Sequence, residues 1–206
     1  YGLIAAGVRH GAGYPITPWS SIMETLRTEF PKYNGLFVQC EDEIAAVSTA
    51  LGFSYSGRLA ITGSAGPGLS LKMEALGWAV MAEMPIIVVN VQRGGPSTGQ
   101  PTKVEQGDLL TTIFGSHGDA PKVVLAPSSI EDCFYSVIAA RRIAETFNMV
   151  VVVLSDASLA TAQQPFARPE FDPAWLAPPV DQSQVPEGLA PYAWDPGTGL
   201  ARRFVP

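Results

Sequence analysis

The sequence predicts an α/β fold of the doubly wound type, in which helices cover both faces of a mainly parallel sheet. Strand-like and helix-like segments alternate from Gly11 to Ala160. The segment Pro85–Val91, PIIVVNV, is almost entirely apolar and β-branched, which is typical of a strand covered on both faces. We therefore expect this strand to be central. The α/β domain is predicted at residues 1–162, followed by a proline-rich arm at residues 163–206 that leads toward a further domain.

Composition and charge argue against several classes of protein. The 206 residues carry a net charge of −6, and 47% of them are hydrophobic. Basic residues cluster only as the pairs Arg141-Arg142 and Arg202-Arg203, which argues against a nucleic-acid or anionic-membrane surface. No apolar run reaches membrane-spanning length. Partners are therefore expected to be proteins or small molecules.

The cysteines and the N-terminus set two further expectations. Cys40 and Cys133 are far apart and form no C-x-x-C motif, so neither a zinc site nor an iron–sulfur cluster is expected within this chain alone. Reduced thiols favour a cytoplasmic location. The chain begins with Tyr rather than Met, shows no signal-peptide pattern, and residues 3–8 resemble the end of a helix. We therefore expect a fragment of a longer polypeptide.

Residues 11–18, GAGYPITP, predict a turn and a short strand around Tyr14 and Ile16. Thr17 is the expected N-cap of the next helix, with Pro18 as its first helical residue. Apolar residues at four-residue intervals then predict an amphipathic helix over residues 19–30.

Three acids, Glu41, Asp42 and Glu43, stand where a predicted strand, Leu36–Cys40, gives way to a helix that runs to Gly52 or Phe53. The helix face expected to pack on the sheet contains Ile44, Val47, Ala50 and Leu51. Acids in a first helical turn complement the helix dipole and cap free N–H groups without any catalytic role. The alternative is that Glu43 is a catalytic carboxylate at the mouth of the sheet.

A glycine-rich turn, residues 63–68 with the sequence GSAGPG, joins a predicted strand at Arg58–Thr62 to a predicted helix at Leu69–Ala82. Backbone N–H groups at a helix start attract phosphate. The glycine order differs from that of dinucleotide-binding and P-loop motifs, and Pro67 removes one N–H. We favour the interpretation that these glycines let the backbone approach a neighbouring segment closely.

The second half of the chain contains a long irregular loop at residues 92–106, QRGGPSTGQPTKVEQ, which is a candidate functional loop. Further elements are predicted as a short helix at 108–114, a strand at 122–126, a helix from Ser128 or Ser129 to Glu145, and a last strand at 149–154. Nine of the 18 prolines lie between residues 165 and 206. We expect Trp175, Tyr192 and Trp194 to anchor this arm on a neighbouring surface.

The strand-ending loops are where an open α/β sheet binds ligands. Here they supply a hydroxyl, a carboxylate, a flexible glycine backbone and the cations Arg93 and Lys103. His10 and His117 have no nucleophile or metal-ligand spacing near them, so we interpret both as structural. A carboxylate beside apolar residues suits a different role, in which it shares a proton with a ring nitrogen of a bound cofactor.

Several long motifs occur in order: YPITP, QCEDEIAAVSTALGFSYSG, TGSAGPGLSLKMEALG, MPIIVVNVQRGGPSTGQPTKVEQGDLL, APSSIEDCF and VVVVLSDASLA. Together they resemble the α subunit of the 2-oxoacid:ferredoxin oxidoreductases of the 2-oxoglutarate type, over about residues 1–160. The resemblance implies the pyrimidine-binding domain of the thiamine diphosphate-binding fold. It also implies the family's reaction, the oxidative decarboxylation of a 2-oxoacid to an acyl-coenzyme A with reduction of ferredoxin.

The resemblance also implies roles for particular residues. The carboxylate matching Glu43 bonds N1′ of the aminopyrimidine and favours the tautomer that removes the proton from thiazolium C2. The cofactor-binding residues are Pro15, Glu43, Ser64 and Gly66. The substrate-binding residues are Thr17 and Arg93, and a guanidinium is suited to a carboxylate. No metal ligand is expected here, so a separate β subunit is expected to supply the diphosphate site, Mg²⁺ and the [4Fe-4S] cluster, and this chain alone is expected to be inactive.

Two positions depart from the family pattern: Trp19 replaces a small residue, and Ala65 replaces a serine. They affect the expected fit of the substrate pocket and one cofactor contact. Three alternatives remain open from the sequence. They are a non-catalytic interaction domain of the same fold, the pyrimidine domain of another thiamine diphosphate enzyme, and a nucleotide-binding flavodoxin-like protein that uses residues 62–68.

Overall fold

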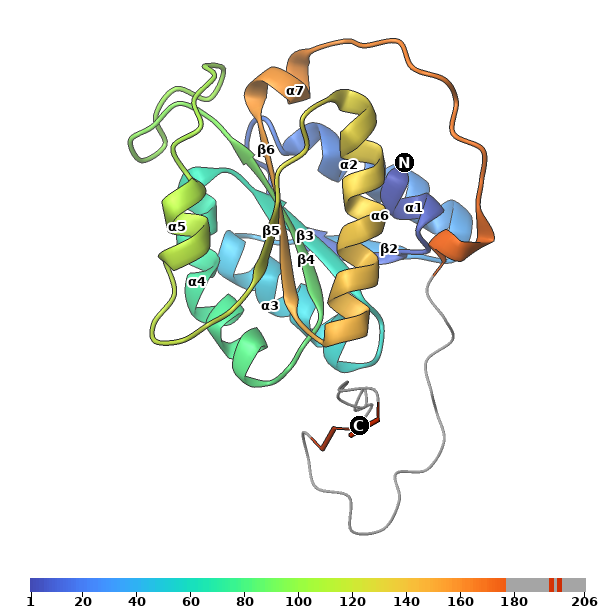
Figure 1. Cartoon of the computed structure of the whole chain (residues 1–206). Helices are drawn as coiled ribbons and strands as arrows, with labels where there is room; N and C mark the ends of the chain where they lie inside the picture. The colour runs from blue at the N-terminus through green and yellow to red at the C-terminus, as the bar shows by residue number, and fades with distance from the viewer. Residues whose placement is uncertain (177–192, 195, 198–206) are drawn as a thin grey trace.

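The computed structural model describes residues 1–176, 193–194 and 196–197. Its centre is a six-stranded sheet with the strand order β2-β1-β3-β4-β6-β5, in which all neighbouring strands are parallel (Figure 1). The strands are β1 (His10–Gly13), β2 (Leu36–Gln39), β3 (Ala60–Ser64), β4 (Ile86–Gln92), β5 (Val123–Leu125) and β6 (Val150–Asp156). The predicted doubly wound α/β fold is confirmed.

Helices lie on both faces of this sheet (Figure 1). The α-helices are α1 (Gly2–Ala5), α2 (Ser20–Glu29), α3 (Glu43–Tyr55), α4 (Gly66–Met81), α5 (Leu109–Phe114), α6 (Ile130–Phe147) and α7 (Ala157–Thr161). Two short 3-10 helices are η1 (Phe30–Tyr33) and η2 (Pro173–Trp175). Within the described ranges, no helix is both long and apolar enough to cross a membrane.

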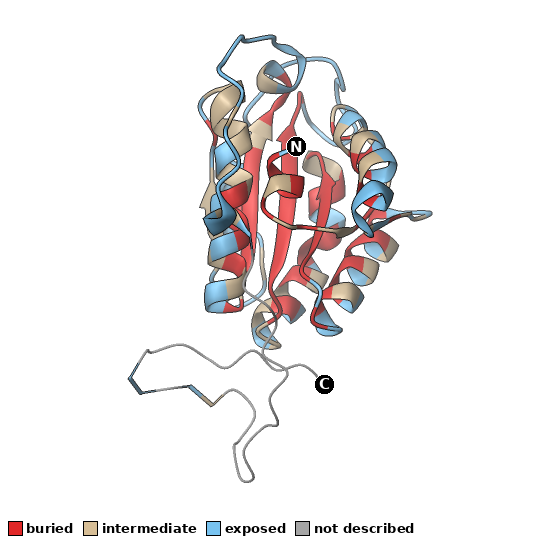
Figure 2. Cartoon of the chain, turned by 90° about the vertical axis from the view of Figure 1, so that its right-hand side faces the viewer, coloured by how far each residue is buried: buried red, intermediate tan, exposed pale blue. Residues whose placement is uncertain are grey.

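Alternate residues of β4 point into two separate hydrophobic cores. Ile87, Val89 and Val91 pack with residues of α1, α2 and α6, whereas Ile86 and Val88 pack with residues of α3 and α4. All seven residues of this strand are buried, which confirms that it is central. Figure 2 shows the same layering, with buried residues concentrated on the sheet and on the inward faces of the helices.

The first strand lies earlier than the sequence predicted. β1 is His10–Gly13, and Tyr14 and Ile16 come after it. Strand propensity favours β-branched and aromatic residues, so the sequence HGAG gave a weak signal. Close packing requires small residues here, because a Cβ on Gly11 would lie 2.8 Å from a methyl carbon of Ile61.

The start of α2 also differs from the prediction. Its N-cap is Trp19, which makes no side-chain capping bond, so the prediction that Thr17 caps the helix and Pro18 opens it was wrong. The indole of Trp19 is fully buried over β3, where a Cβ on Gly63 would lie 2.2 Å from its ring. This tryptophan, which departs from the family pattern, therefore belongs to the core.

Helix α3 begins as predicted. Asp42 is its N-cap, and the Asp42 carboxylate accepts a hydrogen bond from the backbone N–H of Ala45 at 2.7 Å. Glu43 is the first helical residue and is 7% exposed.

The rotation of α3 about its axis was predicted only in part. Val47, Ala50 and Leu51 are buried as expected, but Ile44 is 55% exposed. Glu43 takes the inward direction in the first turn because it lies three residues before the buried Ala46 and four before Val47.

The end of the described chain returns to α6. Trp175 makes edge contacts with Phe134 and Tyr135 of α6, at ring-centroid distances of 5.7 and 6.1 Å, and the Arg141 guanidinium donates a hydrogen bond to its carbonyl. Trp175 thus anchors this segment on the domain itself. Trp194 is 64% exposed, and Tyr192 lies outside the described residues. The division at residues 162 and 163 stays a prediction.

The contact between Trp19 and Gly63 can be tested by substitution. Gly63→Ala should destabilise the domain by about 1–3 kcal/mol, because the added methyl group would collide with the fully buried ring of Trp19 and force the core to shift. Denaturant unfolding measures the change. Gly77→Ala in α4 is the matched control, since nothing lies within 4 Å of its added Cβ, and it should stabilise by about 0.5–1 kcal/mol. Equal effects of the two substitutions would contradict the packing described.

Candidate functional site

The carboxyl ends of the parallel strands meet at one edge of the sheet, and the loops after β1, β2, β3 and β4 leave from that edge. These loops are residues 14–19, 40–42, 65 and 93–108. All the site residues predicted from the sequence lie on them or beside them. Ligands of open α/β sheets bind at such an edge.

Glu43 and Ser64 face the same point in space. A Cβ built on Gly68 would lie 2.6 Å from Oε1 of Glu43 and 1.9 Å from Oγ of Ser64. Gly68 is the third residue of α4, so a glycine is needed where the first turn of α4 passes the first turn of α3. The structure confirms that the glycine-rich turn permits a close approach.

Several buried polar atoms without partners lie on or beside the carboxyl halves of β3 and β4. Among the described residues, Thr62 Oγ1, Ser64 Oγ and Asn90 Oδ1 lie on the sheet face that α3 and α4 cover, and Arg93 Nε follows the end of β4. Trp19 Nε1 is on the opposite face, and Arg141 Nε and Asn148 Oδ1 lie elsewhere. No described residue donates a hydrogen bond to the carboxylate of Glu43. Because native proteins leave few buried polar groups unpaired, this cluster indicates a binding site for a polar molecule.

Lys72 of α4 is a functional candidate that the sequence analysis missed. Its side chain is fully buried, and its Nζ donates a hydrogen bond of 3.0 Å to the backbone carbonyl of Glu43. Burial lowers the pKa of Lys72 to about 8, although the negative charges of Glu43, Cys40 and Asp42 oppose this shift. The sequence carried a signal, because Lys72 lies between Leu69 and Leu76 at helical spacing on the apolar face.

Arg93 and Thr17 are brought together, as predicted. Arg93 is 7% exposed, and its two terminal nitrogens donate hydrogen bonds to the carbonyls of Thr17 at 2.7 Å and Thr98 at 2.6 Å. The side chain of Thr17 is exposed, and so is Pro15. The guanidinium therefore ties the loop after β1 to the loop after β4.

A cavity of about 450 Å³ opens between the start of α4 and the loop after β4. Its lining includes Gly66, Ser70, Arg93, Glu105, Asp108 and Thr111. Of the predicted site residues, only Gly66 and Arg93 line it, whereas Pro15, Thr17, Glu43 and Ser64 do not. Asp108 was not predicted. Its carboxylate accepts a hydrogen bond of 2.8 Å from the side-chain amide of Asn90. Its backbone N–H donates one of 3.0 Å to the side-chain oxygen of Gln92, so both partners are side chains of β4.

The two histidines lie elsewhere. The His10 ring packs against Phe53 at a centroid distance of 5.1 Å, and burial lowers its pKa. His117 is exposed on the loop after α5. In the described part of the chain, no three His, Cys, Asp or Glu side chains converge as metal ligands.

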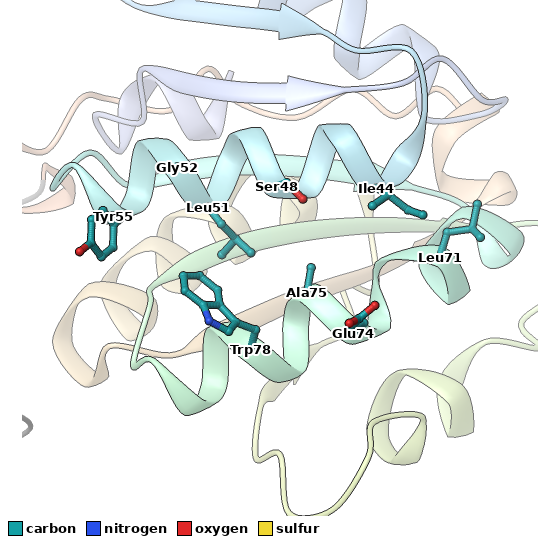
Figure 3. A pocket seen from close by; sticks show the side chains of 9 residues that line it. All are labelled: Ile44, Ser48, Leu51, Gly52, Tyr55, Leu71, Glu74, Ala75 and Trp78. Carbon is teal, nitrogen blue, oxygen red and sulfur yellow. The ribbon is translucent and has the colours of Figure 1, made fainter.

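A second hollow of about 530 Å³ is an apolar groove between α3 and α4 (Figure 3). Its walls are Ile44, Ser48, Leu51, Gly52 and Tyr55 of α3 and Leu71, Glu74, Ala75 and Trp78 of α4. Four of these side chains are large, apolar or aromatic, and 43–55% exposed: Ile44, Tyr55, Leu71 and Trp78. Two of the lining residues, Ile44 and Leu71, are the sequence neighbours of Glu43 and Lys72.

Comparison with known proteins identifies the family. The family described as pyruvate flavodoxin/ferredoxin oxidoreductase, thiamine diphosphate-binding, matches residues 1–203. The chain belongs to this family. It is 44% identical, over its whole length, to the 2-oxoglutarate oxidoreductase subunit KorA of Mycobacterium tuberculosis, of which it covers 32%. It is 46% identical over 82% of its length to the 2-oxoglutarate synthase subunit KorA of Archaeoglobus fulgidus, of which it covers 49%.

Solved structures place this oxidoreductase-family domain in the same fold as its relatives. The 2-oxoglutarate:ferredoxin oxidoreductase from Magnetococcus marinus, with 2-oxoglutarate, coenzyme A and succinyl-CoA bound, matches with a TM-score of 0.76 and 47% identity. The match covers 77% of this chain and 28% of that one. Benzoylformate decarboxylase from Polynucleobacter necessarius, at 20% identity and a TM-score of 0.60, supports the fold alone. The chain thus spans a third to a half of the curated relatives described above.

The buried lysine of this family domain predicts an unusual dependence of stability on pH. The pKa of Lys72 is about 8 in the folded chain and near 10.5 in an unfolded one. Between these values the unfolded chain binds more protons, so stability should rise with pH from about 8 to about 10.5, by about 3 kcal/mol at most. Below pH 8 this lysine contributes no slope.

The measurement compares the wild-type chain with Lys72→Met by denaturant unfolding at several pH values from 7 to 10. As the pH rises above 8, the free energy of unfolding of wild type should increase relative to that of the variant. The comparison removes the contribution of other groups that titrate in the same range. A difference between the two proteins that stays constant with pH would contradict the assigned pKa.

Proposed function

We propose that this chain supplies the pyrimidine-binding half of a thiamine diphosphate site in a 2-oxoacid:ferredoxin oxidoreductase. The substrate is 2-oxoglutarate, the products are an acyl-coenzyme A and reduced ferredoxin, and the enzyme acts in the cytoplasm. One observation carries the proposal: the buried side chain of Glu43 and the unpaired Ser64 hydroxyl lie side by side against Gly68, where only a glycine fits.

This arrangement fits an aminopyrimidine, which offers ring nitrogens and an amino group to hydrogen-bonding side chains. Thiamine diphosphate, when bound, supplies the nucleophilic carbon that attacks the ketone of the oxoacid. Glu43 would hold a proton at the pyrimidine N1′ atom, and the low exposure of its side chain, 7%, would limit the access of water to that bond. Ser64, Gly66 and Pro15 complete the contacts on this side, Gly66 through a backbone that carries no side chain.

Arg93 and Thr17 are proposed to face the oxoacid. A guanidinium has five N–H donors, and the carbonyls of Thr17 and Thr98 accept one each from Arg93. The remaining donors, including the unpaired Nε, suit a substrate carboxylate. Since Arg93 lines the cavity between α4 and the loop after β4, that cavity is the proposed substrate entrance.

A separate β subunit is proposed to complete the site with the diphosphate-binding residues, Mg²⁺ and the [4Fe-4S] cluster, and to pass electrons to ferredoxin. We propose that it covers the α3–α4 groove. The groove begins next to Glu43, the side from which the rest of the cofactor must be held, and exposed aromatic and aliphatic side chains are enriched at the centre of protein interfaces.

The role of Glu43 is tested by Glu43→Gln in the complex of the full α subunit with its β subunit. Oxoacid-dependent ferredoxin reduction should fall about 100-fold or more, because a neutral amide cannot hold the proton at N1′. Glu41→Gln is the matched control: Glu41 lies two residues earlier and is exposed. Retained turnover in the Glu43 variant would exclude this mechanism, and binding of the β subunit without any turnover by the wild-type complex would favour a non-catalytic interaction domain.

The proposed β-subunit surface is tested by Trp78→Asp. A carboxylate at the end of the groove lined by Tyr55 and Trp78 should weaken the α–β complex at least tenfold, measured by sedimentation or interferometry, because a charge would be buried without a partner. Phe147→Asp is the control, since Phe147 is also exposed but lies at the end of α6, on the other face of the sheet. Loss of self-association by Trp78→Asp with unchanged affinity for the β subunit would assign the groove to a second copy of this chain instead.

A further inference from the structure

Burial of Lys72 at this position is unfavourable for the stability of the fold. This lysine lies on α4 among Leu69, Met73 and Leu76, all of which pack in the core between α4 and the sheet, and none of its surface is exposed. Burial of an ammonium group is unfavourable, and lysine is almost never fully buried without a partner. A methionine would fill similar space without that penalty. The presence of a lysine here therefore needs an explanation from the groups that its ammonium contacts.

The hydrogen-bond partner of the ammonium and the acidic groups that act on its pKa belong to one segment, the end of β2 and the start of α3. Its Nζ donates to the carbonyl of Glu43 at 3.0 Å, and the acidic groups that favour its charged form are Glu43, Cys40 and Asp42. The carbonyl of Glu43 is in the first turn of α3, which carries the proposed catalytic carboxylate.

The position of Lys72 along α4 links this bond to the glycine-rich turn. Lys72 follows Gly68 by four residues, so both lie on one face of α4, and helical side chains lean toward the N-terminus of their helix. Gly68 leaves space for the carboxylate of Glu43, while Lys72, one turn further along, holds the backbone of the same residue. The two contacts fix α3 and α4 to each other at two points.

We propose that Lys72 is a positioning residue that ties the first turn of α3 to α4 and so sets the placement of the Glu43 carboxylate opposite Ser64 and Gly68. This inference rests on the proposed function, because it assigns the purpose of that placement to cofactor binding. It places the lysine outside the reaction itself, since its hydrogen bond goes to a backbone carbonyl.

The test compares Lys72→Met, Lys72→Arg and the control Lys122→Met in the complex of the full α subunit with its β subunit. Lys122 is a partly buried lysine next to β5, at the opposite edge of the sheet from β2, and it bonds Ser116 and Ala120. Four quantities are measured: the dissociation constant of thiamine diphosphate, the KM for the oxoacid, the unfolding temperature, and the hydrogen exchange of amides in the first turn of α3.

Lys72→Met should raise the dissociation constant of thiamine diphosphate at least tenfold and speed exchange in the first turn of α3. The unfolding temperature should stay the same or rise, and the oxoacid KM should change less than twofold, because Arg93 is untouched. Lys72→Arg keeps a donor and a charge and should stay within about threefold of wild type, and Lys122→Met should match wild type. If the arginine variant does not fold, the methionine variant decides.

Two results would overturn the inference. One is Lys72→Met with wild-type cofactor affinity and wild-type exchange. The other is a loss of affinity that comes with a lowered unfolding temperature and a raised oxoacid KM, which is the pattern of a purely structural residue. Failure of the proposed function looks different: thiamine diphosphate would then fail to bind the wild-type complex or would bind Glu43→Gln equally well, while the exchange data would still report whether Lys72 holds α3.

Discussion

The close approach of two helix starts, α3 and α4, is the constraint on which the rest of this structure depends. Parallel strands deliver both helices to the same edge of the sheet, and Gly68 allows them to meet because a Cβ there would collide with Ser64 and Glu43. Each turn alone has an ordinary explanation: Asp42 caps one helix, and glycines open the other. Only their juxtaposition places a buried carboxylate against an unpaired hydroxyl.

Polar groups are distributed unequally between the two ends of the sheet. The strands β4 and β6 consist mostly of valine and isoleucine, and their side chains belong to the hydrophobic cores on the two faces of the sheet. Buried charges that face the carboxyl edge, such as Glu43, Lys72 and Arg93, lower stability unless something compensates for their lost hydration. Natural proteins accept such local conflicts mainly at functional sites, where ligand binding or catalysis depends on them.

The sequence predicted those features that depend on local periodicity and capping. The central strand β4 and the start of a helix after the acids at residues 41–43 have strong local signals, and both were predicted correctly. The β1 strand was misplaced because its residues are small for reasons of tertiary packing, not of strand propensity. Lys72 was missed because its partner is 29 residues away in the sequence. Neither contact can be read from spacing, because it arises only when distant segments pack.

Unpaired polar atoms of the site lie on the sheet face that α3 and α4 cover, and the exposed apolar groove lies between the same two helices. The first turn of α3 contributes Glu43 to the site. Other residues of the same helix, including Ile44 and Tyr55, line the exposed groove. A single partner surface that lies along α3 and α4 would both bury the apolar stripe and close the polar site. Assembly and cofactor binding would then be coupled, since ordering the first turn of α3 favours both.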